Sequence, residues 1–447
     1  MSKKTVRNVK GEVPGPKARA VIKKTSKLIS PSIARDDPLV VESAHGAVVT
    51  DVDGNKFIDF SSGIAVLSTG STHPRVVAAA KRQLDKFLHF SYTDFYYENL
   101  VTLAEKLCEL TPIPGEKMVY WGNSGAEANE AAMKLARNYT KRPLYLAHSG
   151  AFHGRTMGTL SLTASKPIQR KGASPLVPEV VHFPFPYCYR CPWRQTFPEC
   201  DYYCVDYFKE QYLEKFVPVE DVSAYFFEPF QGEGGYVLPP PEYFERMSFL
   251  RKGGVLFVAD EVQTGIGRSG KFFAVEHYGI EPDIISVAKG IASGMPLGGI
   301  VAKASVMRSW VPGQHASTFG ANPVAVEAAL ATLEVISSER LMENAVKMGR
   351  VAMKRFEEMK ERYEMVGDVR GKGLFIGVEM VKTKKGKERG VREADEVTHE
   401  CFREGLVLIK AGRNTLRVIP PLNVAREELE EGIDVMEAAI AKVSPRA

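Results

Sequence analysis

Two charged residues stand at the ends of strongly apolar segments. Asp260 closes the segment "VLFVAD", and Lys289 follows "DIISVA", with glycines and small residues directly after it. A buried carboxylate or ammonium group is costly unless it is paired or has a chemical task. Taken alone, a strand-end aspartate such as Asp260 most often bonds to a nearby loop amide, and that alternative stays open.

A third polar group follows another apolar segment, "MVYW". The stretch "GNSGAEANE" begins a helical pattern in which Ser124 can offer a hydroxyl, and Gly125 and Ala126 backbone N–H groups, to an anion. A Ser-Gly pair before a helix is more often an ordinary cap. Together, however, an amine, a carboxylate and a phosphate-binding helix start are the groups that pyridoxal phosphate requires. The amine forms a Schiff base, and the carboxylate keeps the pyridine nitrogen protonated.

Short apolar segments bounded by turn residues predict the strands that would position these groups. Helix-like segments separate several of them, for example the one in which Ala128, Ala132 and Leu135 share a face. The alternation predicts an α/β domain with a mostly parallel sheet. Ligands of such sheets bind beyond the carboxyl ends of the strands, where these polar groups stand. The predicted strands are "KMVYWG", "PLYLA", "EVVHFPF", "VSAYFFEP", "GVLFVADE", "DIISVA" and "GGIVAK".

The two ends of the chain show other patterns. Residues 40–60 predict hairpin-like strands, because Asp53 and Gly54 form a turn signal. Residues 337–363 predict a long amphipathic helix, which a strand and a final helix follow. We expect both ends to combine into a smaller α/β domain. The predicted limits are 1–75 and 335–447 for the smaller domain, 76–334 for the large one, 372–381 for the strand and 425–443 for the final helix.

The composition is that of an ordinary globular protein. Of the 447 residues, 44% are hydrophobic and 25% charged, and the formal net charge is +5. Lysines gather near the N-terminus and near residue 381, a pattern more typical of solvated surface than of a nucleic-acid-binding face. No segment approaches the roughly 18 apolar residues of a membrane helix. The basic N-terminus lacks a secretion signal's apolar stretch, so we expect a cytoplasmic protein without nucleic-acid or membrane partners.

Four of the six cysteines lie in one short stretch, "YCYRCPWRQTFPECDYYC". Their spacing suits a zinc or iron–sulfur site, or two disulfides if the source organism keeps intracellular bridges. A surface loop remote from the chemistry is at least as good an interpretation, and the sequence leaves these alternatives open. The four residues are Cys188, Cys191, Cys200 and Cys204.

Over nearly its whole length, the sequence resembles the class III, or ω-type, aminotransferases of pyridoxal-phosphate fold type I. The resemblance extends to 4-aminobutyrate aminotransferases and to related archaeal amino-acid racemases. It implies a large domain with a mostly parallel seven-stranded sheet and a smaller α/β domain from both chain ends. It rests on the ordered motifs "VDGNKFIDFSSGIAVLSTGSTHP", "GNSGAEANEAAMKLAR", "FHGRTMGTLS", "EPFQGEGG", "ADEVQTGIGRSG", "SVAKGIASGMPLG", "STFGANPVA" and "LRVIPPL".

The family pattern implies roles around the coenzyme. Lys289 matches the Schiff-base lysine, which carries a proton between substrate and coenzyme once substrate has displaced it, and Asp260 matches the partner of the pyridinium nitrogen. Phe152 matches the aromatic residue that stacks on one face of the ring, and Val262 would press on the other. Gln263 matches the residue near the phenolic oxygen of the coenzyme.

The resemblance also implies how the phosphate is held. Ser124, Gly125 and Ala126 would bind it from within the chain. Thr318 matches a threonine that contacts the phosphate across a subunit boundary, so an isolated chain would have an incomplete site. A homodimer or a dimer of dimers is therefore expected.

Further residues match the groups that hold substrate carboxylates. Arg417 in "LRVIPPL" resembles an arginine that takes an α-carboxylate by two hydrogen bonds, and Glu233 in "QGEGG" resembles the glutamate that pairs with it otherwise. This arginine–glutamate switch lets one pocket accept a carboxylate or an uncharged end. Arg155 in "FHGR" resembles a second carboxylate holder. For any single arginine, a surface or inter-domain salt bridge is the commoner role.

The resemblance predicts an aminotransferase that acts on an ω-amino or general amino acid with a 2-oxo acid as acceptor. Ile64 stands where 4-aminobutyrate aminotransferases carry isoleucine and ornithine aminotransferases tyrosine, which favours the 4-aminobutyrate type. Ser71 and Ala321 replace a histidine and a glycine that are usual in the family. The alternative is a broad-specificity racemase of neutral amino acids, because racemisation needs only loss and return of the α-proton on opposite faces.

Overall fold

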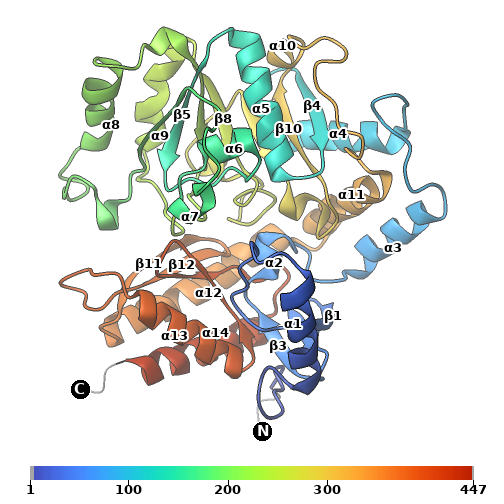
Figure 1. Cartoon of the computed structure of the whole chain (residues 1–447), viewed down its shortest axis with the longest axis vertical. Coiled ribbons are helices and arrows are strands. Elements are labelled where there is room, and N and C mark those ends of the chain that lie inside the picture. The colour runs from blue at the N-terminus through green and yellow to red at the C-terminus, as the bar shows by residue number, and fades with distance from the viewer. Residues whose placement is uncertain (1–4, 445–447) are drawn as a thin grey trace.

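A seven-stranded sheet forms the centre of the large domain in the computed structural model, which describes residues 5–444 (Figure 1). The strand order is β4-β10-β9-β8-β7-β5-β6, and within this sheet β10 alone runs antiparallel to its neighbours. The predicted mostly parallel sheet is confirmed, and each of the seven predicted segments overlaps one strand. The strands are β4 (Lys117–Gly122), β5 (Leu144–Ser149), β6 (Val180–Pro184), β7 (Val222–Phe227), β8 (Leu256–Asp260), β9 (Ile284–Val287) and β10 (Gly298–Lys303).

The central strands are covered on both faces. Every residue of β7, β8 and β9 is buried, as expected for parallel strands with continuous apolar sequences. Helix α5 (Gly125–Thr140) lies against these strands and buries small residues, including Ala128 and Ala132. Because β7, β8 and β9 run in one direction, the residues that follow them meet at one edge of the sheet.

Elements from both chain ends form the smaller domain, in the lower half of Figure 1. In its first sheet, of order β1-β2-β3-β13, Leu406 of β13 pairs in parallel with Ile58 of β3. The second sheet has the order β11-β12-β15-β14. The pairing of β3 with β13 confirms the predicted joining of the two ends. The elements are β1 (Val41–His45), β2 (Val48–Asp51), β3 (Lys56–Asp59), β11 (Val366–Lys372), β12 (Phe375–Met380), β13 (Leu406–Val407), β14 (Ile409–Ala411), β15 (Thr415–Val418), α12 (Leu341–Arg362), α13 (Val391–Arg403) and α14 (Arg426–Val443).

The smaller domain differs from the prediction in several details: α13, β13, β14 and β15 lie where no helix or strand was predicted, and one helix and one further strand also differ. The long helix predicted at 337–363 is divided: α11 (Pro323–Ser338) ends before α12 begins, and Arg340 between them has a left-handed backbone (φ 53°) that a continuous α-helix does not allow. Strand β11 was not predicted. Its two glycines and its alternating polar residues resemble a loop in the sequence, but it pairs with β12 along its length.

The predicted domain limits stay predictions. Both fall inside helices, α3 (Pro74–Leu84) and α11, rather than in linkers. The remaining helices are α1 (Pro16–Leu28), α2 (Ser62–Ala65), α4 (Glu98–Leu110), α6 (Met157–Leu162), α7 (Pro167–Arg170), α8 (Tyr203–Phe208), α9 (Tyr243–Met247) and α10 (Ala304–Met307).

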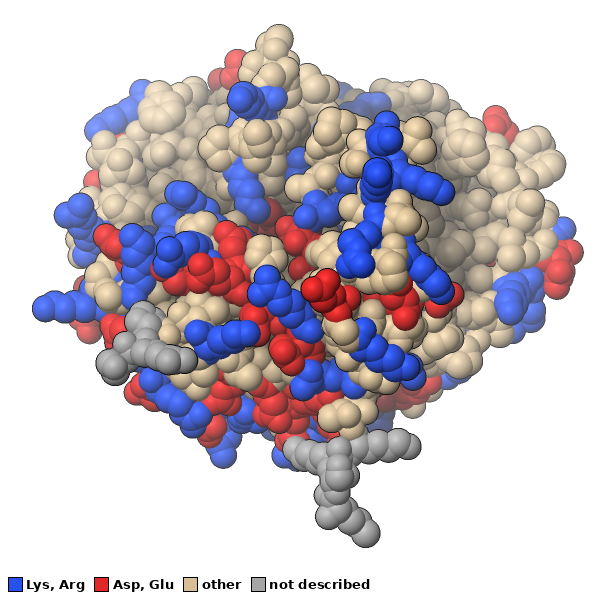
Figure 2. Space-filling view, turned by 60° about the horizontal axis from the view of Figure 1, so that its bottom comes forward, with Lys and Arg blue, Asp and Glu red and all other residues tan. Residues whose placement is uncertain are grey.

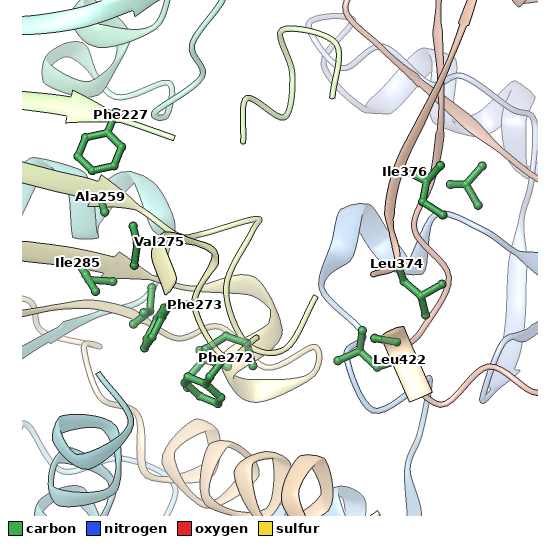
Figure 3. Close-up of a cluster of buried hydrophobic side chains, with 14 of the residues drawn as sticks. Phe227, Ala259, Phe272, Phe273, Val275, Ile285, Leu374, Ile376 and Leu422 are labelled. Atoms are coloured by element: carbon green, nitrogen blue, oxygen red, sulfur yellow. The ribbon is translucent and has the colours of Figure 1, made fainter. Parts of the chain in front are cut away.

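One hydrophobic cluster continues from the large sheet into the smaller domain (Figure 3). Phe227, Ala259 and Ile285 come from the central strands, and Leu374 and Leu422 come from the smaller domain. Close-packed interiors resist deformation. The shared core therefore holds the smaller domain where its side chains can reach the edge of the large sheet.

Two further features concern membrane spans and surface charge. Within residues 5–444, no helix combines the length and the apolar character that a membrane span needs. On the face shown in Figure 2, basic and acidic side chains are intermixed. Residues 1–4, which begin the predicted lysine cluster, lie outside the described residues.

Candidate active site

A cavity of about 460 Å³ opens where β7, β8 and β9 end and α5 begins. This volume suits a small-molecule site. A larger hollow of about 680 Å³ beside α14 is lined mainly by charged surface residues and contains none of the predicted site residues. Ten predicted residues line the first cavity: Ser124, Gly125, Ala126, Phe152, Arg155, Glu233, Asp260, Val262, Gln263 and Lys289.

Asp260, the last residue of β8, is held by three donors and is 4% exposed. Its Oδ2 accepts hydrogen bonds from Asn129 Nδ2 at 2.7 Å and from His153 Nδ1 at 2.8 Å. Its Oδ1 accepts one from the backbone N–H of Val262 at 3.0 Å. The loop amide considered in the sequence analysis is therefore one partner, but the carboxylate also faces a histidine and an amide side chain inside the cavity.

His153 and Glu228 also line the cavity and extend this polar cluster. Burial opposes a charge on His153, but its hydrogen bond to Asp260 and the negative charges of Asp260 and Glu228 outweigh burial and raise its pKa. Burial raises the pKa of Glu228 to about 7, although the charge on His153 works against this rise. Glu228 accepts hydrogen bonds from the backbone N–H groups of Phe152 and Gly232 and so ties two cavity loops together. His153 and Asp260 therefore form a buried hydrogen-bonded pair.

Lys289 follows β9 at the floor of the cavity. Its backbone is left-handed (φ 47°), a conformation that costs a non-glycine residue on the order of 1 kcal/mol and is often found at functional sites. The next residue, Gly290, has no room for a side chain, because a Cβ would overlap the hydroxyl of Ser68. Burial lowers the pKa of the Lys289 amine to about 8, with Asp260 opposing the shift and Arg417 adding to it.

The N-terminus of α5 points into the cavity. Ser124 is the N-cap, and its Oγ accepts a hydrogen bond from the backbone N–H of Glu127 at 3.2 Å. Ser124 therefore does act as an ordinary helix cap, one of the two roles considered for this motif. Of the first-turn N–H groups, that of Glu127 is taken by this cap, whereas those of Gly125 and Ala126 have no partner within the helix and can bind an anion. A Cβ on Gly125 would come within 2.8 Å of Val262, so the helix starts against the loop that follows β8.

The predicted arginine–glutamate pair is present across the domain boundary. Arg417 Nη1 on β15 lies 3.4 Å from Glu233 Oε2, whose loop follows β7. The other oxygen of Glu233 lies 2.7 Å from Lys166 Nζ. Arg155 stands beside Phe152, with its guanidinium carbon 5.7 Å from the ring centre. Gln263 Oε1 accepts a hydrogen bond from the hydroxyl of Tyr236 at 2.7 Å.

Three predicted residues lie outside the lining of the cavity: Arg417, which contacts the lining residue Glu233, and Ile64 and Thr318, which do not contact the other site residues. Ile64 is 43% exposed and has a left-handed backbone (φ 66°), which is rare for a β-branched residue. Thr318 lies in an exposed turn next to Phe319, itself 63% exposed. The structure of a single chain therefore does not bring these two side chains to the other site residues.

Sequence reasoning missed four residues of the site: Asn129, His153, Lys166 and Glu228. Glu228 directly follows β7, so the rule that selected Asp260 also applies to it. His153 lies within the quoted motif "FHGR". Asn129 lies within the quoted motif "GNSGAEANE", whereas Lys166 lies in none of the quoted motifs, and only the packing of the segment before α7 brings it to Glu233.

The four clustered cysteines surround a second, very small cavity, together with Trp193 and Tyr202. All four are free thiols. In the described part of the chain, no group of three or more His, Cys, Asp and Glu residues is arranged to hold a metal ion. Their loop reaches the smaller domain, where Tyr187 and Arg190 both contact Glu379. The choice between a metal site, disulfides and a plain surface loop stays open.

The fold and its cavity define a pyridoxal-phosphate-dependent enzyme of fold type I. The family model for class III aminotransferases matches residues 32–440. The chain belongs to this family, and the resemblance seen in the sequence is confirmed.

Proteins with different activities are similar to this chain. The leucine/methionine racemase of Thermococcus litoralis is 42% identical over 407 residues, which cover 91% of each chain. The 4-aminobutyrate aminotransferase of Mycobacterium leprae is 37% identical over 428 residues, 95% of this chain and 96% of that one. Among solved structures, a PLP-bound amine transaminase from an uncultivated Pseudomonas species has a TM-score of 0.86 at 29% identity, covering 93% of this chain and 98% of that chain.

The cavity residues fit the coenzyme of this family. The start of α5 presents free N–H groups for a phosphate, and Lys289 offers an amine of lowered pKa for the aldehyde. Asp260 offers a carboxylate, hydrogen-bonded to His153, for a pyridinium nitrogen. These groups lie in one cavity and on three different elements, as the shape of the coenzyme requires.

Proposed function

We propose that this protein transfers the amino group of an ω-amino or general amino acid, of the 4-aminobutyrate type, to a 2-oxo acid. One observation carries the proposal: the site has two separate arginines. Arg417 is paired with Glu233, and Arg155 stands on the cavity wall beside Phe152. An aminotransferase that uses 2-oxoglutarate must bind an amino donor and a dicarboxylic acceptor in turn, and two carboxylate holders, one of them paired with a glutamate, suit both.

Lys289 and Asp260 would carry the chemistry. Bound pyridoxal phosphate supplies an electron-poor ring that accepts the electron pair of the C–H bond next to the substrate nitrogen. Asp260 would hold the proton on the ring nitrogen, with His153 and Asn129 fixing its orientation. Lys289 would bind the coenzyme covalently and, once released, take the proton from the substrate carbon and return it at another carbon.

Other cavity residues would hold the coenzyme in place. Phe152 and Val262 would pack on its ring, and Gln263, fixed by Tyr236, would face the phenolic oxygen. Ser124, Gly125 and Ala126 would bind the phosphate at the start of α5. Ile64 lies outside the cavity lining of the single chain, and its contact with substrate stays a prediction.

We also propose that the chain forms a homodimer, or a dimer of dimers, in which Thr318 completes the partner's phosphate site. Exposed apolar side chains gather on the segment between α3 and α4, which projects from the body in Figure 1. Phe319 joins them, since its ring centre lies 5.2 Å from that of His89. Apolar patches of this kind mark protein interfaces. The residues are Leu84, Leu88, Phe90, Phe95, Tyr96, Val101 and Phe319.

Racemisation of neutral amino acids is the second candidate. It is supported by the leucine/methionine racemase, which is more similar to this chain, at 42% identity, than the 4-aminobutyrate aminotransferase at 37%. Both reactions begin with removal of a proton by the same lysine. They differ in where the proton returns, and this step depends on small differences in the position of Lys289 and of substrate.

The cytoplasmic location also stays a prediction.

Incubation of the holoenzyme with single L-amino acids or 4-aminobutyrate, with and without 2-oxoglutarate, separates the two functions. We expect product only when the oxo acid is present, with glutamate formed in equal amount to the amine lost. Chiral chromatography of the same samples detects the other outcome. D-amino acid that accumulates without oxo acid would overturn the transferase proposal in favour of the racemase.

The lowered pKa of Lys289 predicts how the apoenzyme takes up its coenzyme. Only the neutral amine attacks an aldehyde, so the rate of covalent coenzyme binding should rise about tenfold per pH unit below pH 8 and level off above it. Stopped-flow absorbance after mixing apoenzyme with pyridoxal phosphate measures this rate. A rate that keeps rising up to the ordinary lysine value of 10.5 would show that burial does not tune this amine.

A further inference from the structure

Glu233 contacts two cations rather than one. Its Oε1 lies 2.7 Å from Lys166 Nζ, and its Oε2 lies 3.4 Å from Arg417 Nη1. Lys166 directly precedes α7 in the large domain, whereas Arg417 lies on β15 of the smaller domain. The glutamate side chain therefore bridges the two domains at the edge of the cavity, and the closer contact is the one with Lys166.

The contact with Glu233 does not satisfy all the hydrogen-bond donors of Arg417. Arg417 is 5% exposed, and its Nε is a buried donor that has no acceptor among the described residues. A buried donor without a partner is costly. An incoming carboxylate can satisfy Arg417 more fully than Glu233 does, because a guanidinium binds a carboxylate best through two parallel hydrogen bonds.

The backbone of Glu233 is anchored, so only its side chain is free to respond. The carbonyl oxygen of Glu233 accepts a hydrogen bond from the N–H of Gly412 at 2.7 Å. A substrate carboxylate that binds Arg417 displaces the Glu233 side chain from it. Glu233 then needs another positively charged partner, because otherwise it becomes an unpaired carboxylate in a partly buried site. An unpaired carboxylate there would oppose substrate binding.

We propose that Lys166 is a positioning residue that retains Glu233 when Arg417 binds an α-carboxylate. The inference rests on the proposed function, since it concerns the same site. Lys166 lowers the cost of separating Glu233 from Arg417 and so favours ligands that carry an α-carboxylate. An ω-amino acid whose carboxylate goes to Arg155 leaves the Glu233–Arg417 pair in place and gains nothing from Lys166. Lys166 thereby sets the balance between the two classes of substrate.

The test compares ligands that differ only by the α-carboxylate. L-Leucine and 3-methylbutylamine form one pair, and L-alanine and ethylamine form another. Each is mixed with holoenzyme in the absence of an oxo acid, and the dependence of the initial rate of the coenzyme's spectral change on ligand concentration gives a half-saturation concentration. In Lys166→Met we expect this concentration to rise about tenfold for the amino acids and to stay within about twofold for the amines and for 4-aminobutyrate.

Three further variants separate this role from general damage. Lys166→Arg keeps the cation and should restore most of the affinity. Lys171→Met removes an exposed lysine from the same segment and should change nothing. In a Glu233→Gln background, Lys166→Met should have no further effect, because the two residues act as a pair. Melting temperature and the coenzyme spectrum confirm that each variant is folded and loaded.

The possible outcomes are distinct. An equal loss for amino acids and matched amines in Lys166→Met, or no loss at all, would overturn the inference and leave the proposed function intact. A full loss that persists in the Glu233→Gln background would also overturn it. A wild-type holoenzyme whose spectrum responds to none of these amines and amino acids would refute the proposed function, and the inference with it.

Discussion

Replacing Lys289 with alanine should abolish turnover and remove the covalent link to the coenzyme. The lysine would provide both the covalent attachment and the proton transfer, so we expect a loss of at least about 10⁴-fold. Activity assays measure the loss. Borohydride reduction followed by peptide mass spectrometry shows whether the coenzyme of the wild-type enzyme is attached at position 289.

The loss should not come from unfolding. Burial lowers the pKa of the Lys289 amine to about 8, which means that the folded protein disfavours the charge that this variant removes. A matched control is Lys303→Ala, because Lys303 ends the neighbouring strand β10 and pairs with Asp283 at 2.6 Å, away from the cavity. That variant should keep the yellow chromophore. Retention of turnover in Lys289→Ala would refute the proposed mechanism.

Asp260→Asn should lower kcat by about 10³-fold or more while coenzyme still binds. An amide cannot stabilise a protonated pyridine nitrogen as a carboxylate does, so the ring would accept electrons poorly. The same change removes the charge that raises the pKa of His153, so the histidine should become neutral. Steady-state kinetics measure the loss, and the coenzyme spectrum reports the protonation of the ring.

The control for Asp260 is another buried carboxylate at a strand end. Asp283 precedes β9, is 5% exposed, and pairs with Lys303 and Arg251 away from the cavity. Asp283→Asn should reduce the free energy of unfolding by about 1 kcal/mol, because Arg251 and Lys303 are each about one-third exposed and solvent screens both pairs, with kcat nearly unchanged. If Asp260→Asn and Asp283→Asn lower kcat equally, the role of Asp260 is structural. Asp260→Glu, which keeps the charge, should recover part of the activity.

The large domain was predictable because its signals are local. Strands such as β7 and β9 are buried on both faces, so their sequences are continuous apolar segments that end where polar residues begin. Strand β11 escaped prediction for the opposite reason: at the border of its sheet, it keeps polar residues and glycines. Motifs that place Lys289, Asp260 and the α5 start in order along the chain identified the family.

The surroundings of these residues depend on contacts between distant segments. Asn129 approaches Asp260 from α5, and His153 approaches from the loop after β5, across 131 and 107 residues of sequence. Neither residue type predicts such a contact, because an asparagine on a helix and a histidine in a loop are usually exposed to solvent or hydrogen-bonded to nearby residues. The raised pKa values of His153 and Glu228 exist only because burial and charge are combined at this point.

By itself, the sequence determined the α/β class, the aminotransferase family, and the lysine and carboxylate at the ends of neighbouring strands, because hydrophobic pattern and motif order are properties of the linear chain. The tertiary structure alone decided that Asp260 is hydrogen-bonded to His153 and that Glu233 contacts Lys166 as well as Arg417. Such choices of partner arise from how the packed strands and the two domains place side chains a few ångströms apart, and no spacing along the chain encodes those distances.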